Sequence, residues 1–372
     1  GLCQNVGERS PKGVDEVSRV TLKDVAARAG VSYQTVSKVL NGRAAVSDET
    51  LERIWQAVRE LNYRPNVSAR NLRTRVSNLI GYPWHYSDKG YFHPVLDAFV
   101  HSIANAAEAE GFHILTFVTD DLSNPAPYRE LYLRNQVGGF ILADINRDDP
   151  RVQMLIEQEI PFTAFGRANE EWDHYWVDVD GRAGMCQVVA HLVEQGHERI
   201  AMVTWPEGSR TGQARENGYR EALIAAGLEP APELLVRGLH AAGTGSHAFR
   251  QLWELPARRR PTAIACVSDL IAVGALQAAA NAGLTVGRDL AITGFDNVEL
   301  TDYTQPPLTS VRQPIPQVGE MAVAMLLAQI LEREPPAKTM LVAPELVIRA
   351  SSLTGPRNLA TTISQRAERQ ES

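Results

Sequence analysis

Four polar residues near the start of the chain, Tyr33, Gln34, Ser37 and Lys38, are spaced as one face of a short helix. A glutamine amide can pair with adenine through two hydrogen bonds, and a lysine can donate to guanine. Apolar residues recur every three or four positions in "TLKDVAARAGVSYQTVSKVLNG", which predicts two short helices separated at a glycine. A helix–turn–helix places its second helix in the major groove, so this polar face is expected to read base edges. A helical hairpin with a solvated polar face is the alternative.

Two serines are expected to begin helices in this region. Ser32 is a suitable N-cap for the helix that starts at Tyr33, and Ser47 for a third helix, "DETLERIWQAVREL". The buried stripe of that third helix is expected to consist of Leu51, Ile54, Trp55, Val58 and Leu61. Trp55 is therefore predicted to be a core residue rather than a DNA contact.

Charge is divided unevenly along the chain. Residues 20–75 contain ten Lys or Arg against five acids, although the whole chain has a formal net charge of -7. The remainder must then carry a charge of -12. A basic head on an acidic body is typical of a protein that binds phosphates with one part only.

The run "VTLKDVAARAGVSYQTVSKVLNG", followed by "VSDETLERIWQAVRELNYRPNVSARNLR", resembles the DNA-binding head of the lac repressor family. The similarity continues to about residue 353. The resemblance implies DNA contacts from Ser32, Tyr33, Gln34, Thr35, Ser37, Lys38, Asn41, Ser47, Thr50, Tyr63, Asn66 and Leu72. Lys38 stands where arginine is frequent in the family, and a lysine lacks the bidentate fork, so readout at that base pair is expected to be looser.

The resemblance also implies a domain plan. The plan has a disordered lead (1–19), a helix–turn–helix domain (20–64), a hinge (65–76), a ligand-binding and dimerisation domain (77–353) and a tail (354–372). From Ser77 onward, short apolar strands alternate with amphipathic helices, which predicts an α/β fold of doubly wound parallel sheets.

In the family this body has the two lobes of periplasmic sugar-binding proteins, and the chain crosses between them three times. Carried onto this sequence, lobe 1 covers about 77–177 and 307–340, and lobe 2 about 178–306 and 341–353. The tail shows no leucine heptad, so a homodimer without a tetramerising coiled coil is expected.

The expected ligand site lies at the carboxyl ends of the parallel strands, where such sheets open their crevices. Aromatic rings beside Asp, Arg and Asn suit sugars, whose C–H faces stack while their hydroxyls need polar partners. The expected ligand-binding residues are Trp84, Tyr91, Phe92, Arg167, Trp205, Arg215, His240, Asp269 and Asp296.

By family position, Arg215 and Asp296 bridge ligand hydroxyls, and Asp269 adds an acceptor. His240 stands where relatives often carry an aromatic side chain that packs on the ligand. A structural role is the alternative at several places: turn capping for Asp296, and lobe packing for Tyr91, Phe92 and Trp176. For Asp120 and Asp121, turn capping is the preferred interpretation.

Other functions find little support in the sequence. Cys3, Cys186 and Cys266 are too scattered for a disulfide framework or a zinc site, so no metal and no cofactor are expected. No run of eighteen apolar residues and no signal-peptide stretch occur, which favours the cytoplasm over a membrane. The expected function is a repressor of sugar-utilisation genes that answers to a di- or oligosaccharide, and no enzyme activity is expected. A solute-binding protein, a sugar-active enzyme, and a regulator that answers to a purine or to a phosphorylated protein partner are the alternatives.

The family's hinge gives a first testable expectation. The position that matches Leu72 wedges into the minor groove at the operator centre, and such apolar wedges kink DNA. Leu72→Ala should therefore weaken binding to the operator far more than binding to scrambled duplex. Equal losses on both duplexes in a fluorescence-anisotropy titration would contradict the wedge.

Overall fold

The computed structural model of this chain describes residues 20–40, 46–63, 77–85, 93–119 and 124–353. The expected lead, tail and hinge (up to residue 76) lie outside these ranges, as do Asn41, Asn66, Leu72, Tyr91, Phe92, Asp120 and Asp121. The chain divides into two compact units, Gly1–Arg75 and Val76–Ser372. Each unit is described separately below.

The first unit is a head of three helices, α1 (Leu22–Ala29), α2 (Tyr33–Leu40) and α3 (Asp48–Glu60). Gly30 ends α1 in the left-handed conformation, with φ 66°, which a glycine adopts without steric cost. The expected N-caps are present: Ser32 Oγ accepts a hydrogen bond from the Thr35 N–H at 3.1 Å, and Ser47 Oγ accepts one from the Thr50 N–H at 3.4 Å. The sharp turn that a helix–turn–helix needs is therefore built from local sequence signals.

The core of the head differs from the expected stripe on α3. Val25, Val36 and Ile54 are fully buried, whereas Trp55 keeps 43% of its surface exposed and Leu51 keeps 38%. The expectation that Trp55 and Leu51 are core residues was therefore wrong. The inward face of α3 is centred on Ile54 and Ala57, and the residue after Ile54 lies about 100° around the helix.

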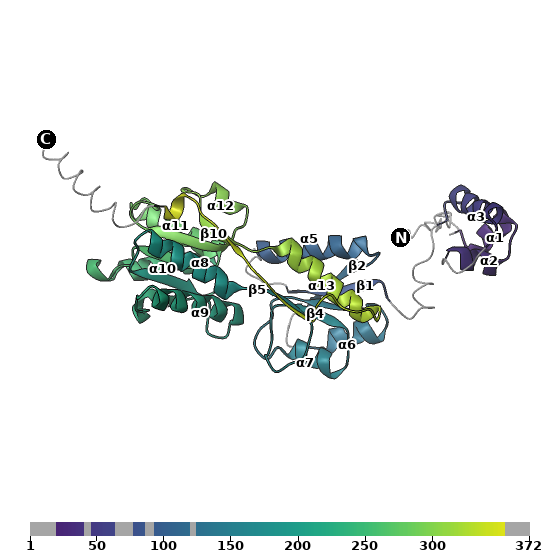
Figure 1. Ribbon diagram of the computed structural model, residues 1–372, viewed down its shortest axis with the longest axis horizontal. Helices are drawn as coiled ribbons and strands as arrows, with labels where there is room; N and C mark the ends of the chain where they lie inside the picture. Colours follow the sequence, from purple (N-terminus) through teal and green to yellow (C-terminus); the bar gives the residue numbers. More distant parts are fainter. Residues whose placement is uncertain (1–19, 41–45, 64–76, 86–92, 120–123, 354–372) are drawn as a thin grey trace, which may run out of the picture. The chain divides into compact units, whose positions relative to one another are not determined.

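The second unit contains two lobes, each built on a six-stranded sheet with helices on its faces (Figure 1). The first sheet is wholly parallel, in the order β11-β5-β4-β3-β1-β2. Its lobe comprises β1 (Leu79–His85), α5 (Pro94–Ala109), β2 (His113–Thr119), α6 (Ala126–Leu133), β3 (Gly139–Leu142), α7 (Pro150–Glu157), β4 (Phe162–Phe165), β5 (Trp176–Val179), α13 (Ile315–Ile330) and β11 (Thr339–Val342).

The second sheet has the order β12-β10-β9-β8-β6-β7, and only β12 runs antiparallel to its neighbour. Its lobe comprises α8 (Gly181–Glu194), β6 (Ile200–Thr204), α9 (Arg210–Ala225), β7 (Leu235–Arg237), α10 (Ala242–Trp253), β8 (Ala263–Cys266), α11 (Asp269–Asn281), β9 (Ala291–Asp296), α12 (Leu300–Tyr303), β10 (Thr309–Arg312) and β12 (Glu345–Val347). Short 3₁₀ turns at Pro232–Leu234, Ala257–Arg259 and Ala350–Ser352 complete it.

The chain passes between the two sheets after β5, after β10 and after β11. The expected lobe boundary at residue 307 therefore needs correction, because β10 pairs with β9 in the second sheet and belongs to the second lobe. Likewise β5 and β11, which extend to residues 179 and 342, belong wholly to the first lobe. The expected boundaries near 177 and 340 lay inside β5 and β11, which are short and have no glycine or proline within them to mark an end. The boundary at 307 was placed at Pro306 and Pro307, before β10 instead of after it.

Apolar residues from both faces of each sheet form the cores of the lobes. In the first lobe, Phe99 and Leu326 are buried on one side, and Phe140 and Leu155 on the other. The second lobe has one large core that contains, among others, Val203, Ile264 and Phe295. Packing in these cores fixes the carboxyl ends of the strands, which lie where the two lobes meet.

Helices α10 and α11 of the second lobe approach each other closely through two glycines. A Cβ atom at Gly245 would lie 1.8 Å from the Ile271 carbonyl oxygen, and one at Gly274 would lie 1.8 Å from the Ala242 carbonyl oxygen. Both obstacles are backbone atoms, so a side-chain rotation cannot relieve them. The two helices can pack at this distance only because neither residue has a side chain.

This close approach predicts that Gly245→Ala destabilises the protein by about 1–3 kcal/mol or more, because the added methyl must push two helices apart. Gly243→Ala is the matched control on the same helix, since nothing lies within 4 Å of its Cβ position. Thermal and urea unfolding would measure both variants. An equal effect of the two substitutions would contradict the close-packing explanation.

Candidate functional site

The candidate DNA-binding surface of the head is the outer face of α2. Tyr33, Gln34 and Lys38 are exposed, as the sequence predicted, and Thr35 is half-buried. Ser37 differs from the prediction, because only 8% of its surface is exposed. It lies beside Val36 on the inward side of the helix, so within the head alone its hydroxyl is not presented to solvent as the sequence suggested.

The other expected DNA contacts of the head lie at helix ends. The Ser47 hydroxyl, at the exposed start of α3, is 2.9 Å from the Thr50 hydroxyl. The Ser32 and Thr35 hydroxyls form the same kind of pair at the start of α2, at 2.8 Å. Tyr63, by contrast, has 8% of its surface exposed and packs into the core of the head. The expected contact from Tyr63 to DNA therefore rests on a side chain that is mostly buried.

The second candidate site is a cavity of about 670 Å³ between the two lobes. It opens at the carboxyl ends of the strands of both sheets, where the sequence placed it. The first lobe contributes, among others, His93, Asp144, Asn146, Phe165 and Asp178. The second lobe contributes, among others, Trp205, Ser209, Arg215, His240 and Asp296, and Gln313 comes from the crossover after β10.

Arg215, on α9, is the buried cation of this cleft, with 3% of its surface exposed. Its Nη1 donates to the Val267 carbonyl and lies 3.7 Å from Asp296 Oδ1. The guanidinium lies 3.6 Å from the ring centre of Phe295 and 5.2 Å from that of Trp205. Its Nε is buried without a hydrogen-bond partner in the described part of the chain. The cleft wall therefore carries a guanidinium that is fixed on several sides.

Asp296 is the last residue of β9 and lies opposite Arg215. Its Oδ1 accepts a hydrogen bond from Gln313 Nε2 at 2.7 Å, and its backbone has φ 119°, which side-chain-bearing residues rarely adopt. Burial raises the pKa of Asp296 to about 6, and Arg215 partly offsets the effect. The protonation state of Asp296 therefore depends on the charges near it in the cleft.

Asp269 lies behind this surface and is not among the residues that line the cavity. Its Oδ1 accepts from the Ser310 hydroxyl at 2.6 Å, and its Oδ2 accepts from the Val298 N–H at 2.9 Å. Burial raises its pKa well above the usual range. One oxygen thus holds β10 and the other holds the loop after β9, so the expected direct contact from Asp269 to ligand has no geometric support.

Two imidazoles meet in the cleft, one from each lobe. His93 precedes α5 and its Nδ1 accepts from the Leu96 N–H at 3.4 Å, whereas His240 follows β7. Their rings stack with centres 4.8 Å apart and planes 28° from parallel. Trp205 meets the His240 ring edge-on at 5.7 Å. The cleft therefore offers flat rings next to its charged groups.

The remaining expected ligand residues lie elsewhere. Trp84 packs beside the first-lobe core, with its ring 6.3 Å from that of Tyr82, and does not line the cavity. Arg167 Nε donates to Asp178 Oδ2 at 2.9 Å and lies just behind the cavity wall. Burial raises the pKa of Asp178, and Arg167 partly offsets the rise. The structure thus brings Trp205, Arg215, His240 and Asp296 together, and Arg167 acts on the cleft through Asp178.

Several cleft residues were missed at the sequence level, namely His93, Asp144, Asn146, Asp178 and Gln313. Asp144 and Asn146 follow the buried strand β3, so the strand-end rule could have identified them. His93 and Gln313 lie before a helix and on a crossover. Their positions follow from the way the two lobes meet.

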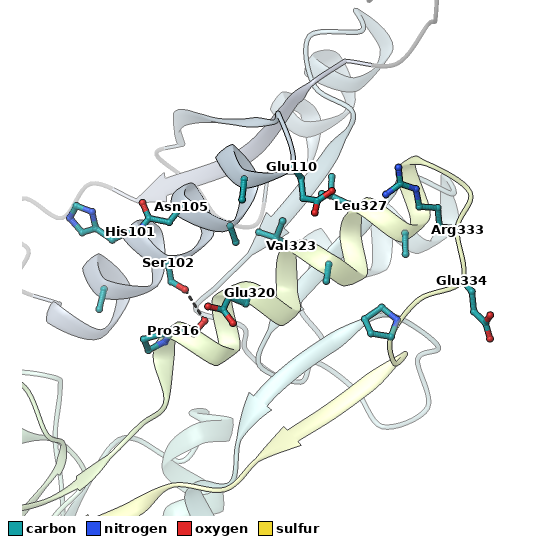
Figure 2. A pocket seen from close by; sticks show the side chains of 16 residues that line it. His101, Ser102, Asn105, Glu110, Pro316, Glu320, Val323, Leu327, Arg333 and Glu334 are labelled. Carbon is teal, nitrogen blue, oxygen red and sulfur yellow. Dashed lines mark hydrogen bonds between the residues drawn. The ribbon is translucent and has the colours of Figure 1, made fainter. Parts of the chain in front are cut away.

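A separate hollow of about 800 Å³ lies on the outside of the first lobe, between α5 and α13 (Figure 2). Small residues such as Ala98, Ala106 and Ala324 line it, and Ser102 Oγ donates to the Pro316 carbonyl at 2.9 Å. At Gly319 a Cβ would lie 2.1 Å from Ser102 Oγ, so the two helices are in close contact. Because α5 begins next to His93, the helix that borders the cleft is also joined tightly to α13.

Two negative findings apply to the described residues. No helix among them is long and apolar enough to cross a membrane. In the same ranges, His, Cys, Asp and Glu side chains form no group of three that could hold a metal ion.

Comparison with known proteins identifies both parts of the chain. Residues 21–66 match the family of bacterial regulatory proteins, lacI family, and residues 189–352 match a periplasmic binding protein-like domain. The HTH-type transcriptional repressor PurR of Erwinia tasmaniensis is 34% identical over 340 residues, which is 90% of this chain and 98% of that protein.

Solved structures give the same result. A LacI-family regulatory protein from Chloroflexus aggregans is 43% identical with a TM-score of 0.71, covering 75% of this chain and 99% of that one. A complex of the transcriptional regulator CelR with cellobiose is 31% identical with a TM-score of 0.68, covering 90% and 100%. The lac repressor dimer bound to operator and the anti-inducer ONPF is 28% identical with a TM-score of 0.77, covering 91% and 100%.

The helix–turn–helix head and the two-lobed body define the class of transcriptional regulators that join a DNA-binding head to a binding-protein-like body. The chain belongs to the lacI family of bacterial regulatory proteins, which confirms the resemblance found in the sequence. It is a DNA-binding transcriptional repressor and not an enzyme.

The exposure of α2 gives a prediction about base readout. Gln34→Ala should cost about 1–3 kcal/mol on the cognate operator and relax the choice at one base pair, because a bidentate amide contact is lost. Gln56→Ala on α3, where the amide donates to Glu60 Oε1 at 2.8 Å, is the control. Selection of preferred sites from random duplexes, followed by anisotropy titrations, would measure both. If both variants keep wild-type specificity, Gln34 is not a reading residue.

Proposed function

We propose that this repressor acts as a homodimer in the cytoplasm and that a small carbohydrate, a di- or oligosaccharide, bound between the lobes controls its hold on operator DNA. The observation that carries the proposal is the meeting of Arg215, Asp296, Trp205 and His240 in one cleft. Flat rings suit the C–H faces of a sugar, and a paired guanidinium and carboxylate suit adjacent hydroxyls. The proposed DNA contacts are the exposed residues of α2 and the N-terminal ends of α2 and α3, together with the hinge.

The charges of the cleft favour a neutral ligand. Among the residues that the structure describes, Asp144, Asp178 and Asp296 line the cavity together with one guanidinium, that of Arg215. Arg167 neutralises Asp178 from behind, at 2.9 Å. A phosphorylated sugar would have to bring its charge close to the other two carboxylates, which costs binding energy in a partly buried site.

The size of the cleft agrees with a ligand larger than a monosaccharide. A volume of about 670 Å³ lies well within the range of ordinary ligand pockets. The similar regulator CelR was solved with cellobiose, a disaccharide. Its identity of 31% over most of both chains is similar to the 34% of the repressor PurR, so the sugar class is argued from the cleft residues and not from identity.

A purine or another flat heterocycle is the second candidate. The stacked rings of His93 and His240 and the indole of Trp205 could hold such a ring as well as a sugar face. We favour hydroxyl-rich ligands, because Asp296, Gln313 and Arg215 place hydrogen-bond acceptors and donors side by side. A ligand screen therefore needs both classes.

Control of DNA binding requires that ligand and operator favour different arrangements of one body. Closing the cleft moves one lobe against the other along three crossovers, and this movement would alter how the first lobes of a dimer hold the hinge segments 65–76. Binding to duplex should fall steeply with salt, because several phosphates are neutralised per dimer.

The test of the ligand site is a thermal-shift screen of neutral di- and oligosaccharides, sugar phosphates and purines, followed by operator release with the best compound. Arg215→Lys and Asp296→Asn should weaken the response about ten- to hundredfold, because loss of a buried hydrogen bond to a ligand hydroxyl costs about 1–3 kcal/mol. Arg182→Ala, which removes an exposed ion pair with Glu221 on the second lobe, is the control.

Operator affinity without ligand should stay the same in all three variants. If the Arg215 and Asp296 variants respond at wild-type ligand concentrations, these residues are not in the site. A screen in which only purines raise the melting temperature would overturn the carbohydrate assignment.

A further inference from the structure

The stacked pair of His93 and His240 is a contact between lobes inside the cleft. Within the described chain, both ring nitrogens of His240 are shielded from solvent and have no hydrogen-bond partner. His93 is held from its own lobe, because its Nδ1 accepts from the start of α5. Each ring therefore depends on the other lobe for the face it buries.

Arg210 provides a second contact between lobes. Its Nη1 donates to the Ala168 carbonyl at 3.1 Å, and its Nη2 lies 2.9 Å from Glu170 Oε1. Arg210 begins α9 of the second lobe, whereas Ala168 and Glu170 follow β4 of the first. Two of the contacts across the cleft are thus made by imidazoles and by a guanidinium.

Charged groups surround the imidazole pair on several elements. Arg215 of α9 faces both rings, and Asp144, after β3, faces His240. Asp178 of β5 and Asp296, at the end of β9, line the same cavity. A proton on either ring would create a cation against a neighbouring ring and close to the Arg215 guanidinium.

From this geometry we propose that His93 and His240 form a proton-sensitive latch, which holds the lobes together across the cleft only while both imidazoles are neutral. The proposal rests on the proposed function only in taking this cleft as the effector site. It adds a regulatory input, acidity, to whatever small molecule binds there.

The sign of the effect follows from the pKa values. Burial lowers the pKa of His93 and of His240 to about 4, from an ordinary value of 6.5. Below pH 6.5 the closed form therefore binds fewer protons than an open form in which both rings are exposed to solvent. Closure is favoured above pH 6.5 and is lost as the pH falls from 6.5 toward 4.

The size of the effect follows from the same linkage. At pH 5.5, one unit below the ordinary value, each histidine shifts the ratio of open to closed forms about tenfold, and the two together up to about a hundredfold. Asp296 acts in the opposite direction, because its pKa is raised to about 6 in the closed cleft, so its protonation favours closure. Opening in acid can therefore not be attributed to that aspartate.

The experiment measures lobe separation by fluorescence energy transfer in the full chain without effector. Dyes are attached through Glu171→Cys and Gly208→Cys, exposed positions of opposite lobes, in a chain with Cys3→Ser and Cys186→Ser. Labelled protein is mixed with excess unlabelled protein, so transfer within one chain is observed. Transfer is then recorded between pH 7.5 and 5.0.

Three variants separate the latch from other causes. His240→Phe keeps a flat ring but cannot take up a proton, and His93→Asn keeps an acceptor for the start of α5. Arg210→Ala removes the other contact and leaves both imidazoles in place. The wild type should lose transfer between pH 7 and 5, and so should Arg210→Ala from a lower starting value, whereas the double variant His93→Asn/His240→Phe should not.

Histidine ring shifts followed by nuclear magnetic resonance give a second readout, with the two rings assigned by the single variants. Ring pKa values near 6.5 for both, transfer that does not change with pH in the wild type, or the same loss in the double variant would each overturn the latch. Because no effector is present, failure of the carbohydrate assignment would leave this result standing, and the reverse also holds.

Discussion

The buried guanidinium of Arg215 is the interaction on which the cleft depends. A charge removed from water needs compensation from every side. Here the Val267 carbonyl, Asp296 and the rings of Phe295 and Trp205 supply it. These partners follow or belong to different strands of the second sheet, so the single cation fixes the relative positions of several loops. Behind the cavity wall, Asp269 accepts hydrogen bonds from the loop after β9 and from Ser310 of β10.

The same arrangement explains why the cleft can respond to a ligand. Arg215 Nε and the indole nitrogen of Trp205 are buried without partners in the described residues. Unsatisfied polar groups of this kind are costly in a folded protein, so they are rare away from sites where something else binds. A ligand hydroxyl could supply the missing hydrogen bonds once the groups that now cover these nitrogens move aside.

Much of the fold and part of the site could be predicted from the sequence, because the relevant signals are local. The caps Ser32 and Ser47, the turn at Gly30 and the alternation of strands and helices are each set by neighbouring residues. Trp205 and Asp296 lie at or just beyond strand ends, whereas Arg215, within α9, was found through the family resemblance. The prediction was wrong for other residues because their surroundings are set by residues far away in the sequence. Trp55 points away from a core centred one residue earlier, and the oxygens of Asp269 are taken up by a loop and a strand that follow it much later.

The three crossovers also set an order for maturation of the protein on the ribosome. The second sheet is complete only when β12 pairs with β10 and Ser351 Oγ donates to the Ile292 carbonyl at 2.6 Å. The first sheet likewise waits for β11, and its core waits for α13. The three helices of the head, by contrast, lie between residues 22 and 60 and carry their own core. Since domains fold as they emerge during synthesis, the head can be folded while neither lobe is complete. A nascent chain therefore acquires its reading surface before it acquires the body that regulates it.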